Sequence, residues 1–327
     1  MRSRMGVLAA AGLGLCLTSC TQVTKTLKAA NLGGDVNQVV AASEKMQSCD
    51  KLKVAPAIQE EYALGSALAI HWAQRGGGLL LSNAAEQGLN TYVNTVGRNL
   101  AMQSPRPELG WTFGVLKDAQ HFNALSAPAG YVFVTRGLLQ GVENEAQLAG
   151  VLAHEIAHVV LKHALNQYVS VKVSTCQGAA AAGVVSAAAS TVVRASHLDG
   201  YLDLDSDTVL MGKMVDGTVD LISKGNSRDA ELAADALAVE LMLSAGYDPR
   251  EYSRLLGQTS GGGGLMENHP SKKDRQEQIK DLLDARREAT DPLARLDEAS
   301  LQRPALPAAF AIVGPGKKPT GVAKDAK

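Results

Sequence analysis

The sequence has few aromatic residues, little net charge and no long hydrophobic run, and each of these excludes a class of protein. Aromatic residues make up 4% of the 327 residues, which argues against an aromatic-rich β-sandwich and, with 32 glycines, favours closely packed helices. The 32 basic side chains nearly balance 33 acidic ones, so we expect no nucleic-acid partner. No run of 18 or more strongly apolar residues occurs, which predicts no transmembrane helix.

Cysteine is also scarce, with four in the chain, and the first two lie within the first 20 residues, which have the pattern of an export signal and its cleavage site. Two arginines precede an uncharged stretch over 6–17, and Leu17-Thr18-Ser19-Cys20 follows. This segment resembles the bacterial lipobox, whose cysteine becomes the acylated first residue of the mature chain. An ordinary signal peptide with a chance cysteine is the alternative. We therefore expect residues 1–19 to be a lipoprotein signal peptide and Cys20 to be lipidated.

The same resemblance predicts where the mature chain resides. Two acyl chains suffice for stable attachment, so the protein would be exported and anchored to a membrane without spanning it. Thr21 after the cysteine is typical of lipoproteins on the periplasmic face of the outer membrane. In that oxidising compartment Cys49 and Cys176 could form a disulfide. The alternative is two separately buried thiols, because the sequence alone cannot place the two Cα atoms within bridging range.

Apolar spacing divides the mature chain into a linker over 20–56, a folded domain over 57–287 and a tail over 288–327. Most of the domain has helical periodicity, and Asn226 with Asp229 is a capping pair typical of a helix start. The β-rich run 131–135 is the clearest strand. Proline, glycine and late lysines predict a largely disordered tail. The expected fold is therefore α+β, mostly helical, with a small β-sheet.

The segment His154-Glu155-Ile156-Ala157-His158 carries the clearest chemistry. Its two imidazoles stand at i and i+4 of an expected helix, so both lie on one face and can bind one metal ion. Glu155 is then placed to act as general base toward a water at a zinc ion. The alternative, two core histidines and a surface glutamate, is disfavoured because burying ionisable groups without purpose is costly.

The third metal ligand must come from elsewhere in the chain. On an ideal helix His163 lies about 140° around from His158, so we do not expect it to ligate. Glu231 is a better candidate, because Glu231 and Asp235 share one face of a helix whose alanines allow close approach. Glu231 would ligate and Asp235 would orient a ligand histidine. Taken alone this pair is weak, since charged i,i+4 pairs on helices usually face solvent.

Several ordered motifs together resemble the zinc metallopeptidase family that includes the CAAX prenyl proteases and the bacterial HtpX and BepA types. They are Asn123-Ala124, the run 130–138, the HEIAH segment, Ser227-Arg228 before Glu231 and Asp235, the run 246–249, and His269-Pro270 followed by Arg275. The resemblance covers roughly residues 57–285. It implies a gluzincin-like metalloprotease domain with an active-site HExxH helix, and one Zn2+ held by His154, His158 and Glu231.

The resemblance also implies roles on the substrate side of the metal. An edge strand around Asn123 and Ala124 would accept a substrate backbone as an extra strand, although Asn123 could instead be a turn residue. His269 and Arg275 would stabilise the oxyanion of the tetrahedral intermediate. Read alone, His269 is a histidine on a glycine-rich loop, where most histidines face solvent. A further hypothesis is that His269 caps the zinc in the resting enzyme.

These observations predict a lipid-anchored zinc metalloendopeptidase that hydrolyses misfolded or unassembled cell-envelope proteins. The envelope quality-control role comes from the resemblance alone. One alternative is an envelope assembly factor or chaperone that binds client chains with little proteolysis, against which the intact Glu155 argues. Another is a zinc-stabilised structural domain, which would have four protein ligands and no general base.

Overall fold

The structure is a computed structural model that describes residues 44–189, 207–258, 272–291 and 295–314. The chain divides into two compact units. The small unit comprises Met1–Val54 and Val169–Met214, and the large unit comprises Ala55–Tyr168 and Val215–Lys327. The domain expected over 57–287 is therefore interrupted by a segment that belongs to the small unit.

The described part is mostly helical with one small sheet, as the composition predicted. Its α-helices are α3 (Ile58–Arg75), α4 (Ala84–Ala101), α5 (Arg136–Leu139), α6 (Glu145–Val160), α7 (His163–Ala189), α9 (Asp207–Ser223), α10 (Arg228–Ser244), α11 (Pro249–Gln258) and α12 (Lys272–Arg287). Short 3-10 turns are η1 (Cys49–Leu52), η2 (Pro128–Gly130), η3 (Glu298–Ser300) and η4 (Ala308–Val313). The strands are β1 (Thr112–Leu116), β2 (Ala124–Ala127) and β3 (Tyr131–Thr135).

The three strands form a mixed sheet in the order β1-β3-β2. β3 runs parallel to β1 and antiparallel to β2, with Leu125 opposite Phe133. The tight connection η2 joins β2 to β3, and there Ala129 has a φ of 65° and Gly130 a φ of 95°. Among the described residues β2 pairs on one side only, so this sheet has the free edge that the sequence predicted around residue 124.

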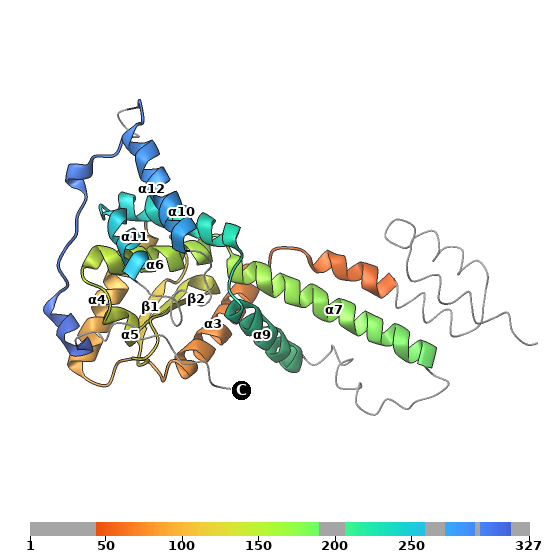
Figure 1. Cartoon of the computed structure of the whole chain (residues 1–327). Coiled ribbons are helices and arrows are strands. Elements are labelled where there is room, and N and C mark those ends of the chain that lie inside the picture. Colours follow the sequence, from red (N-terminus) through yellow and green to blue (C-terminus); the bar gives the residue numbers. More distant parts are fainter. Residues whose placement is uncertain (1–43, 190–206, 259–271, 292–294, 315–327) are drawn as a thin grey trace, which may run out of the picture. The chain divides into compact units, whose positions relative to one another are not determined.

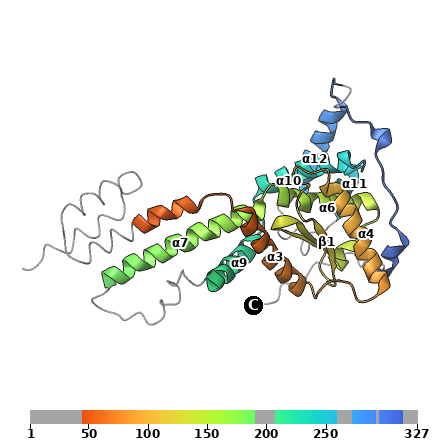
Figure 2. The ribbon, with the colours of Figure 1, turned by 180° about the vertical axis from the view of Figure 1, so that it is seen from behind.

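Helix α6 is the centre of the large unit. Every residue from position 146 to 159 is buried, including both histidines and the glutamate of the HEIAH segment. Asn144 caps the helix by accepting a hydrogen bond from the Gln147 amide at 2.9 Å. The sheet lies on one side of α6, and α10, α11 and α12 lie on the other (Figures 1 and 2). The predicted metal-binding helix is therefore held on both sides by packed elements.

The stretch Glu145–Gly178, which covers α6 and the start of α7, has the length and composition of a membrane-crossing helix, and 72% of its most apolar window is buried in the structure. A buried core helix meets the same criteria, and α6 is such a helix. The backbone also changes direction within this stretch, because Lys162 between the two helices has a φ of 60°.

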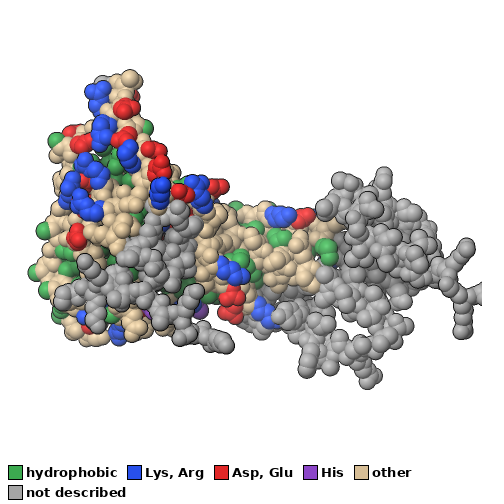
Figure 3. Space-filling view, in the orientation of Figure 1, with side chains coloured by type: hydrophobic (Ala, Val, Ile, Leu, Met, Phe, Trp, Pro, Cys, Tyr) green, Lys and Arg blue, Asp and Glu red, His purple; other side chains and the backbone are tan. Residues whose placement is uncertain are grey.

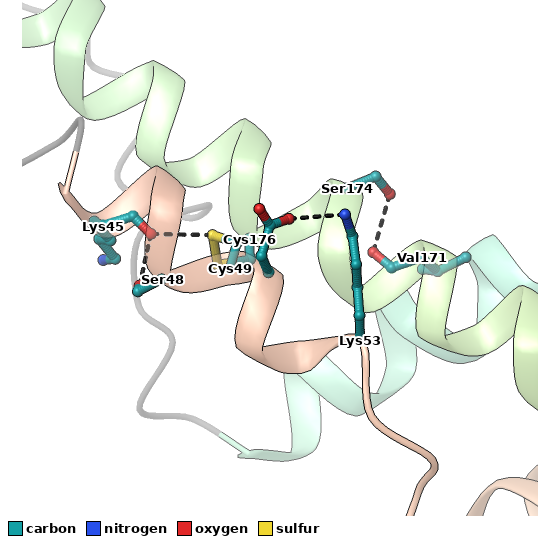
Figure 4. Close-up of a disulfide and its surroundings, with 8 residues drawn as sticks. Lys45, Ser48, Cys49, Lys53, Val171, Ser174 and Cys176 are labelled. Carbon is teal, nitrogen blue, oxygen red and sulfur yellow. Dashed lines mark hydrogen bonds and ion pairs between the residues drawn. A yellow bond between two sulfur atoms is a disulfide. The ribbon is translucent and has the colours of Figure 1, made fainter. Parts of the chain in front are cut away.

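A disulfide joins the two described cysteines of the small unit. Cys49, in η1, bonds to Cys176, on α7, across 127 residues of sequence (Figure 4). Their Cα atoms lie 5.7 Å apart, within the usual range for a disulfide. Of the two alternatives that the sequence left open, the structure has the bonded pair.

The C-terminal segment differs from the expected disordered tail. In the described residues 295–314, Phe310 and Val313 are buried, and the Phe310 ring packs edge-on against Tyr92 with centroids 5.7 Å apart. The Arg136 guanidinium donates to the Ile312 carbonyl at 3.0 Å. The prediction of disorder is wrong for this part, because a few apolar side chains on the short 3-10 turn η4 are enough to dock it on an existing core.

Surface charges of both signs are mixed over α11 and α12 (Figure 3). On α12, Lys280 pairs with Asp284 at 2.7 Å, and Arg228 at the start of α10 pairs with Asp274 at 2.7 Å. On this face, basic side chains are therefore paired with acidic ones.

The approach of α11 to α6 allows a prediction on stability. A Cβ at Gly150 would lie 2.4 Å from the Tyr252 Cβ, so Gly150→Ala should lower the free energy of unfolding by about 1–3 kcal/mol through overpacking. Gly88→Ala on α4 is the matched control: a Cβ there meets nothing within 4 Å, and the variant should be stabilised by about 0.5–1 kcal/mol. Denaturant unfolding of both variants checks this. Equal effects of the two substitutions would contradict the packing argument.

Candidate metal centre and active site

Two helices bring the three predicted ligands together. α6 supplies His154 and His158, whose Nε2 atoms are 2.9 Å apart. α10 supplies Glu231, whose carboxylate lies 3.3 Å from the His154 Nε2 and 3.5 Å from the His158 Nε2. One potential ligand atom from each residue lies within 4.8 Å of the other two, and all three side chains are buried. The geometry is that of a set of donors converging on one point.

Asp235 lies behind the first of these histidines, one turn after Glu231 on α10. Its carboxylate is 2.9 Å from the His154 Nδ1, so it can accept a hydrogen bond from the nitrogen that does not face the other ligands. A carboxylate in this position fixes the ring orientation and tautomer of a metal-binding histidine. The structure therefore places Asp235 where the sequence placed it.

Arg275 occupies a different position from the one expected. Its side chain is 1% exposed, and its guanidinium donates to both carboxylate oxygens of Asp235, at 2.6 and 2.7 Å, and to the Tyr252 hydroxyl at 2.6 Å. It is not among the residues that line the cleft beside Glu155. An oxyanion donor must face the substrate, so the structure places Arg275 as a support of Asp235 and not in the oxyanion role.

The charges around the ligands favour a cation at this point. Burial and the Arg275 charge lower the pKa of His154, but the Asp235 and Glu231 carboxylates outweigh both and raise it to about 9. Burial raises the pKa of Asp235, yet its hydrogen bonds from Arg275 and its contact with His154 hold it at about 2. Two buried carboxylates thus surround His154 with negative potential, which stabilises a proton or a metal ion at the ring.

Glu155 is one of the residues that line a cleft beside this network. Its side chain is buried, and its Oε1 has no hydrogen-bond partner in the described part of the chain. A buried carboxylate oxygen without a partner is costly unless it has a function. The cleft is lined by the segment 123–128, by Glu155, His158 and Val159 from α6, by Lys162 and the first turn of α7, and by Gln167, Ile222 and Asn226.

The free edge of β2 forms one wall of that cleft. The Thr135 amide donates to the Asn123 carbonyl at 2.9 Å, so Asn123 and every second residue after it turn their backbone groups toward β3. Ala124 and Ser126 consequently direct their amide and carbonyl groups toward the open edge. The structure brings Asn123 and Ala124 to the cleft, and Asn123 directly precedes β2, is bonded to Thr135 and does not lie in a turn.

Three residues at the site were not assigned by the sequence. The His163 Nδ1 lies 2.6 Å from the His158 Nδ1, and the Asn226 amide donates to the Glu231 Oε1 at 2.9 Å. The Gln167 amide donates to the Asn226 Oδ1 at 3.1 Å. Asn226 is not the helix cap that the sequence predicted, because the Ser227 hydroxyl accepts the Ala230 amide instead. Burial lowers the pKa of His163 and favours its neutral form.

Two predicted functional residues, His269 and Cys20, lie outside the described residues. The remaining residues fit a catalytic zinc ion. Two imidazoles and one carboxylate are the donor set of many catalytic zinc sites, which leave a position open for water. The orphaned Oε1 of Glu155 adds the general base that a purely structural metal site would lack.

The comparisons with known proteins agree with this geometry. The sequence model of Peptidase family M48 matches residues 87–283, more than half of the chain, including all three candidate ligands and Glu155. The chain belongs to Peptidase family M48. Metallopeptidases of this family are metal-dependent. The α+β fold with an HExxH helix is therefore that of an M48 metallopeptidase domain.

The alignments with named relatives cover only part of this chain and part of each relative. The mitochondrial metalloendopeptidase OMA1 of Schizosaccharomyces pombe is 29% identical over 210 residues, 61% of this chain and 56% of that protein. The metalloendopeptidase OMA1 of Bos taurus is 47% identical over 57 residues, 17% of this chain and 11% of that protein. The beta-barrel assembly-enhancing protease of Yersinia pestis is 35% identical over 75 residues, 23% of this chain and 15% of that protein. The alignment thus spans little more than half of the first relative and much less of the others.

Proposed function

We propose that this M48 metallopeptidase is a zinc-dependent endopeptidase that hydrolyses unfolded or unassembled proteins of the cell envelope. The observation that carries the proposal is the position of Glu155. Glu155 lines the cleft that contains the β2 edge and His158, and its buried Oε1 has no hydrogen-bond partner among the described residues. His158 is one of the three converging ligand side chains. A general base, a metal site and a strand edge in one cleft are what peptide hydrolysis requires.

His154, His158 and Glu231 would hold the metal, and Asp235 would keep His154 in the ligating tautomer. When bound, zinc supplies Lewis acidity and makes a water molecule more acidic. Glu155 takes the proton from the attacking water and then delivers it to the nitrogen of the departing amine. The arrangement separates roles by position, because Asp235 and Arg275 lie behind the ligands and Glu155 lies in the cleft.

The β2 edge supports an extended, unfolded substrate. The outward amide and carbonyl groups of Ala124 and Ser126 can pair with the backbone of a substrate strand, which gives affinity with little dependence on sequence. A folded protein offers few such segments, because most of its backbone groups are already paired. The substrate class we propose is therefore a chain with a locally extended segment, as in misfolded or unassembled proteins.

Lipidation at Cys20 and attachment to the periplasmic face of the outer membrane complete the proposal. They are supported by the lipobox-like segment and Thr21. The name of the Yersinia pestis relative, a beta-barrel assembly-enhancing protease, supports an envelope role.

The test uses the full chain purified in detergent. We expect it to degrade an unfolded protein such as casein, to lose this activity in a chelator, and to recover it with about one equivalent of Zn2+. A folded, disulfide-intact protein should resist until it is reduced and unfolded. Binding of casein without cleavage by the zinc-loaded chain would instead favour the client-binding alternative. Cleavage that persists after complete metal removal would contradict the proposal.

A further inference from the structure

A sharp turn after α6 brings His163 back to the metal site. Continued as an ideal helix, α6 would carry His163 away from His158. Instead α6 ends at Val160, Lys162 takes a φ of 60°, and His163 begins α7. The two imidazoles then meet with ring centroids 4.8 Å apart and their Nδ1 atoms 2.6 Å apart. A non-glycine residue in the left-handed region costs about 1 kcal/mol or more of conformational free energy, so the backbone turn that forms this contact is strained.

We propose that His163 is a positioning residue that fixes the orientation and tautomer of His158, and that it thereby presents its own Nε2–H as a hydrogen-bond donor to the substrate in the cleft. The inference rests on the proposed function in taking the His158 Nε2 as a metal ligand and the cleft as the substrate site. It assigns to His163 a role that the sequence pattern did not indicate.

The tautomers follow from the distances. The His158 Nε2 faces the His154 Nε2 at 2.9 Å and the Glu231 Oε1 at 3.5 Å, so it is the ligating nitrogen. A ligating imidazole nitrogen carries no proton, so the neutral ring holds its proton on Nδ1. At 2.6 Å from that Nδ1, the His163 Nδ1 must be the acceptor.

Asn226 also lies near this nitrogen, with its Nδ2 3.4 Å from the His158 Nδ1, but its orientation is fixed as a donor. Its Oδ1 accepts from the Gln167 amide, and its Nδ2 donates to Glu231. An amide that presents Nδ2 cannot accept the His158 proton. The short contact to His163 thus supplies an acceptor for this proton, which the Asn226 amide does not.

This tautomer of His158 determines which nitrogen of His163 carries a proton toward the cleft. With Nδ1 accepting, the single proton of a neutral His163 sits on Nε2. The ring is partly exposed and lines the same cleft as Glu155 and Ala124, and its Nε2 has no hydrogen-bond partner among the residues that the structure describes. A donor is thus available to a substrate carbonyl on the side of the metal site where Arg275 is absent.

The experiment measures zinc affinity separately from activity, in the full chain, by competition with a chromophoric chelator. His163→Ala should weaken zinc binding by about 10–100-fold, the usual effect of losing a partner of a ligand histidine. His163→Asn places an amide oxygen close to the former Nδ1 and should restore most of the affinity. Its kcat/KM on casein should stay low, because the donor in the cleft is missing. Lys224→Gln, an exposed change near the site, is the matched control and should alter neither measurement.

Unfolding curves of the metal-free variants show whether each still folds. Equal zinc affinity of the wild type and His163→Ala would overturn the positioning role, and so would a loss in His163→Ala that His163→Asn does not restore. A wild-type kcat/KM in His163→Asn would overturn the donor role. Failure of the proposed function looks different, because the wild type itself would then bind no zinc or cleave nothing.

Discussion

Glu155→Gln is expected to lower the rate of peptide hydrolysis by about 10²–10⁴-fold while leaving the metal bound. Glutamine has nearly the same shape, so the packing around position 155, which is 3% exposed, should survive. What is lost is the ability to take a proton from water and return it to the leaving amine. Glu155 contributes no atom to the cluster of His154, His158 and Glu231, so the variant should still hold about one zinc per chain.

The measurement is casein degradation by the wild type and the variant at equal zinc content, determined by elemental analysis. Glu108→Gln removes a carboxylate whose side chain is 68% exposed and is the matched control, with no expected change. Activity of Glu155→Gln within a few-fold of the wild type would contradict the role of Glu155 as general base. Loss of the zinc together with the activity would show that the carboxylate supports the metal instead.

The site residues that the sequence predicts are those whose relative positions follow from helical spacing. His154 and His158 are one turn apart on α6, and Glu231 and Asp235 are one turn apart on α10, so each pair has to share a face once the helix forms. The resemblance supplied the pairing of the two helices, which no local pattern contains. The structure brings all four side chains together, and it agrees with the predicted mostly helical fold and small sheet.

The positions of the other site residues depend on backbone turns or on packing, for which the local sequence contains no pattern. The position of His163 follows from the left-handed conformation of Lys162, and a lysine gives no indication of such a turn. Arg275 follows a glycine-rich loop, and its side chain could have pointed toward the cleft or toward Asp235. Asn226 precedes a serine that is an equally good cap, and the structure uses the serine. The burial of Phe310 and Val313 could not be predicted, because prolines and glycines surround them in a segment whose composition is typical of disorder.

Arg275→Met is expected to lower the free energy of unfolding by about 3–5 kcal/mol, the usual cost of removing one partner of a buried ion pair. Methionine fills a similar volume, so the loss comes from charge. The guanidinium is 2.6 Å from the Asp235 carboxylate and 3.6 Å from that of Glu231, and both carboxylates are buried. Without it two negative charges remain in the interior, and a bound metal ion offsets part of their repulsion. The effect should therefore be larger in a chelator than with saturating zinc.

Urea unfolding of the full chain under both conditions checks this, with Arg228→Met as the control. Arg228 pairs with Asp274 at 2.7 Å, but its side chain is 59% exposed, so we expect its loss to have far less effect on stability than the loss of Arg275. The pH dependence adds a second check. Hydrogen bonds from Arg275 overcome the effect of burial and hold the Asp235 pKa at about 2, below the value of about 4 in an unfolded chain. Asp235 thus stabilises the wild type above about pH 4, and this contribution is lost as the pH falls toward 2. In the metal-free proteins the stability gap between wild type and Arg275→Met should accordingly narrow over that interval. A gap that stays constant there would mean that Arg275 stabilises the fold by packing and not by pairing with Asp235.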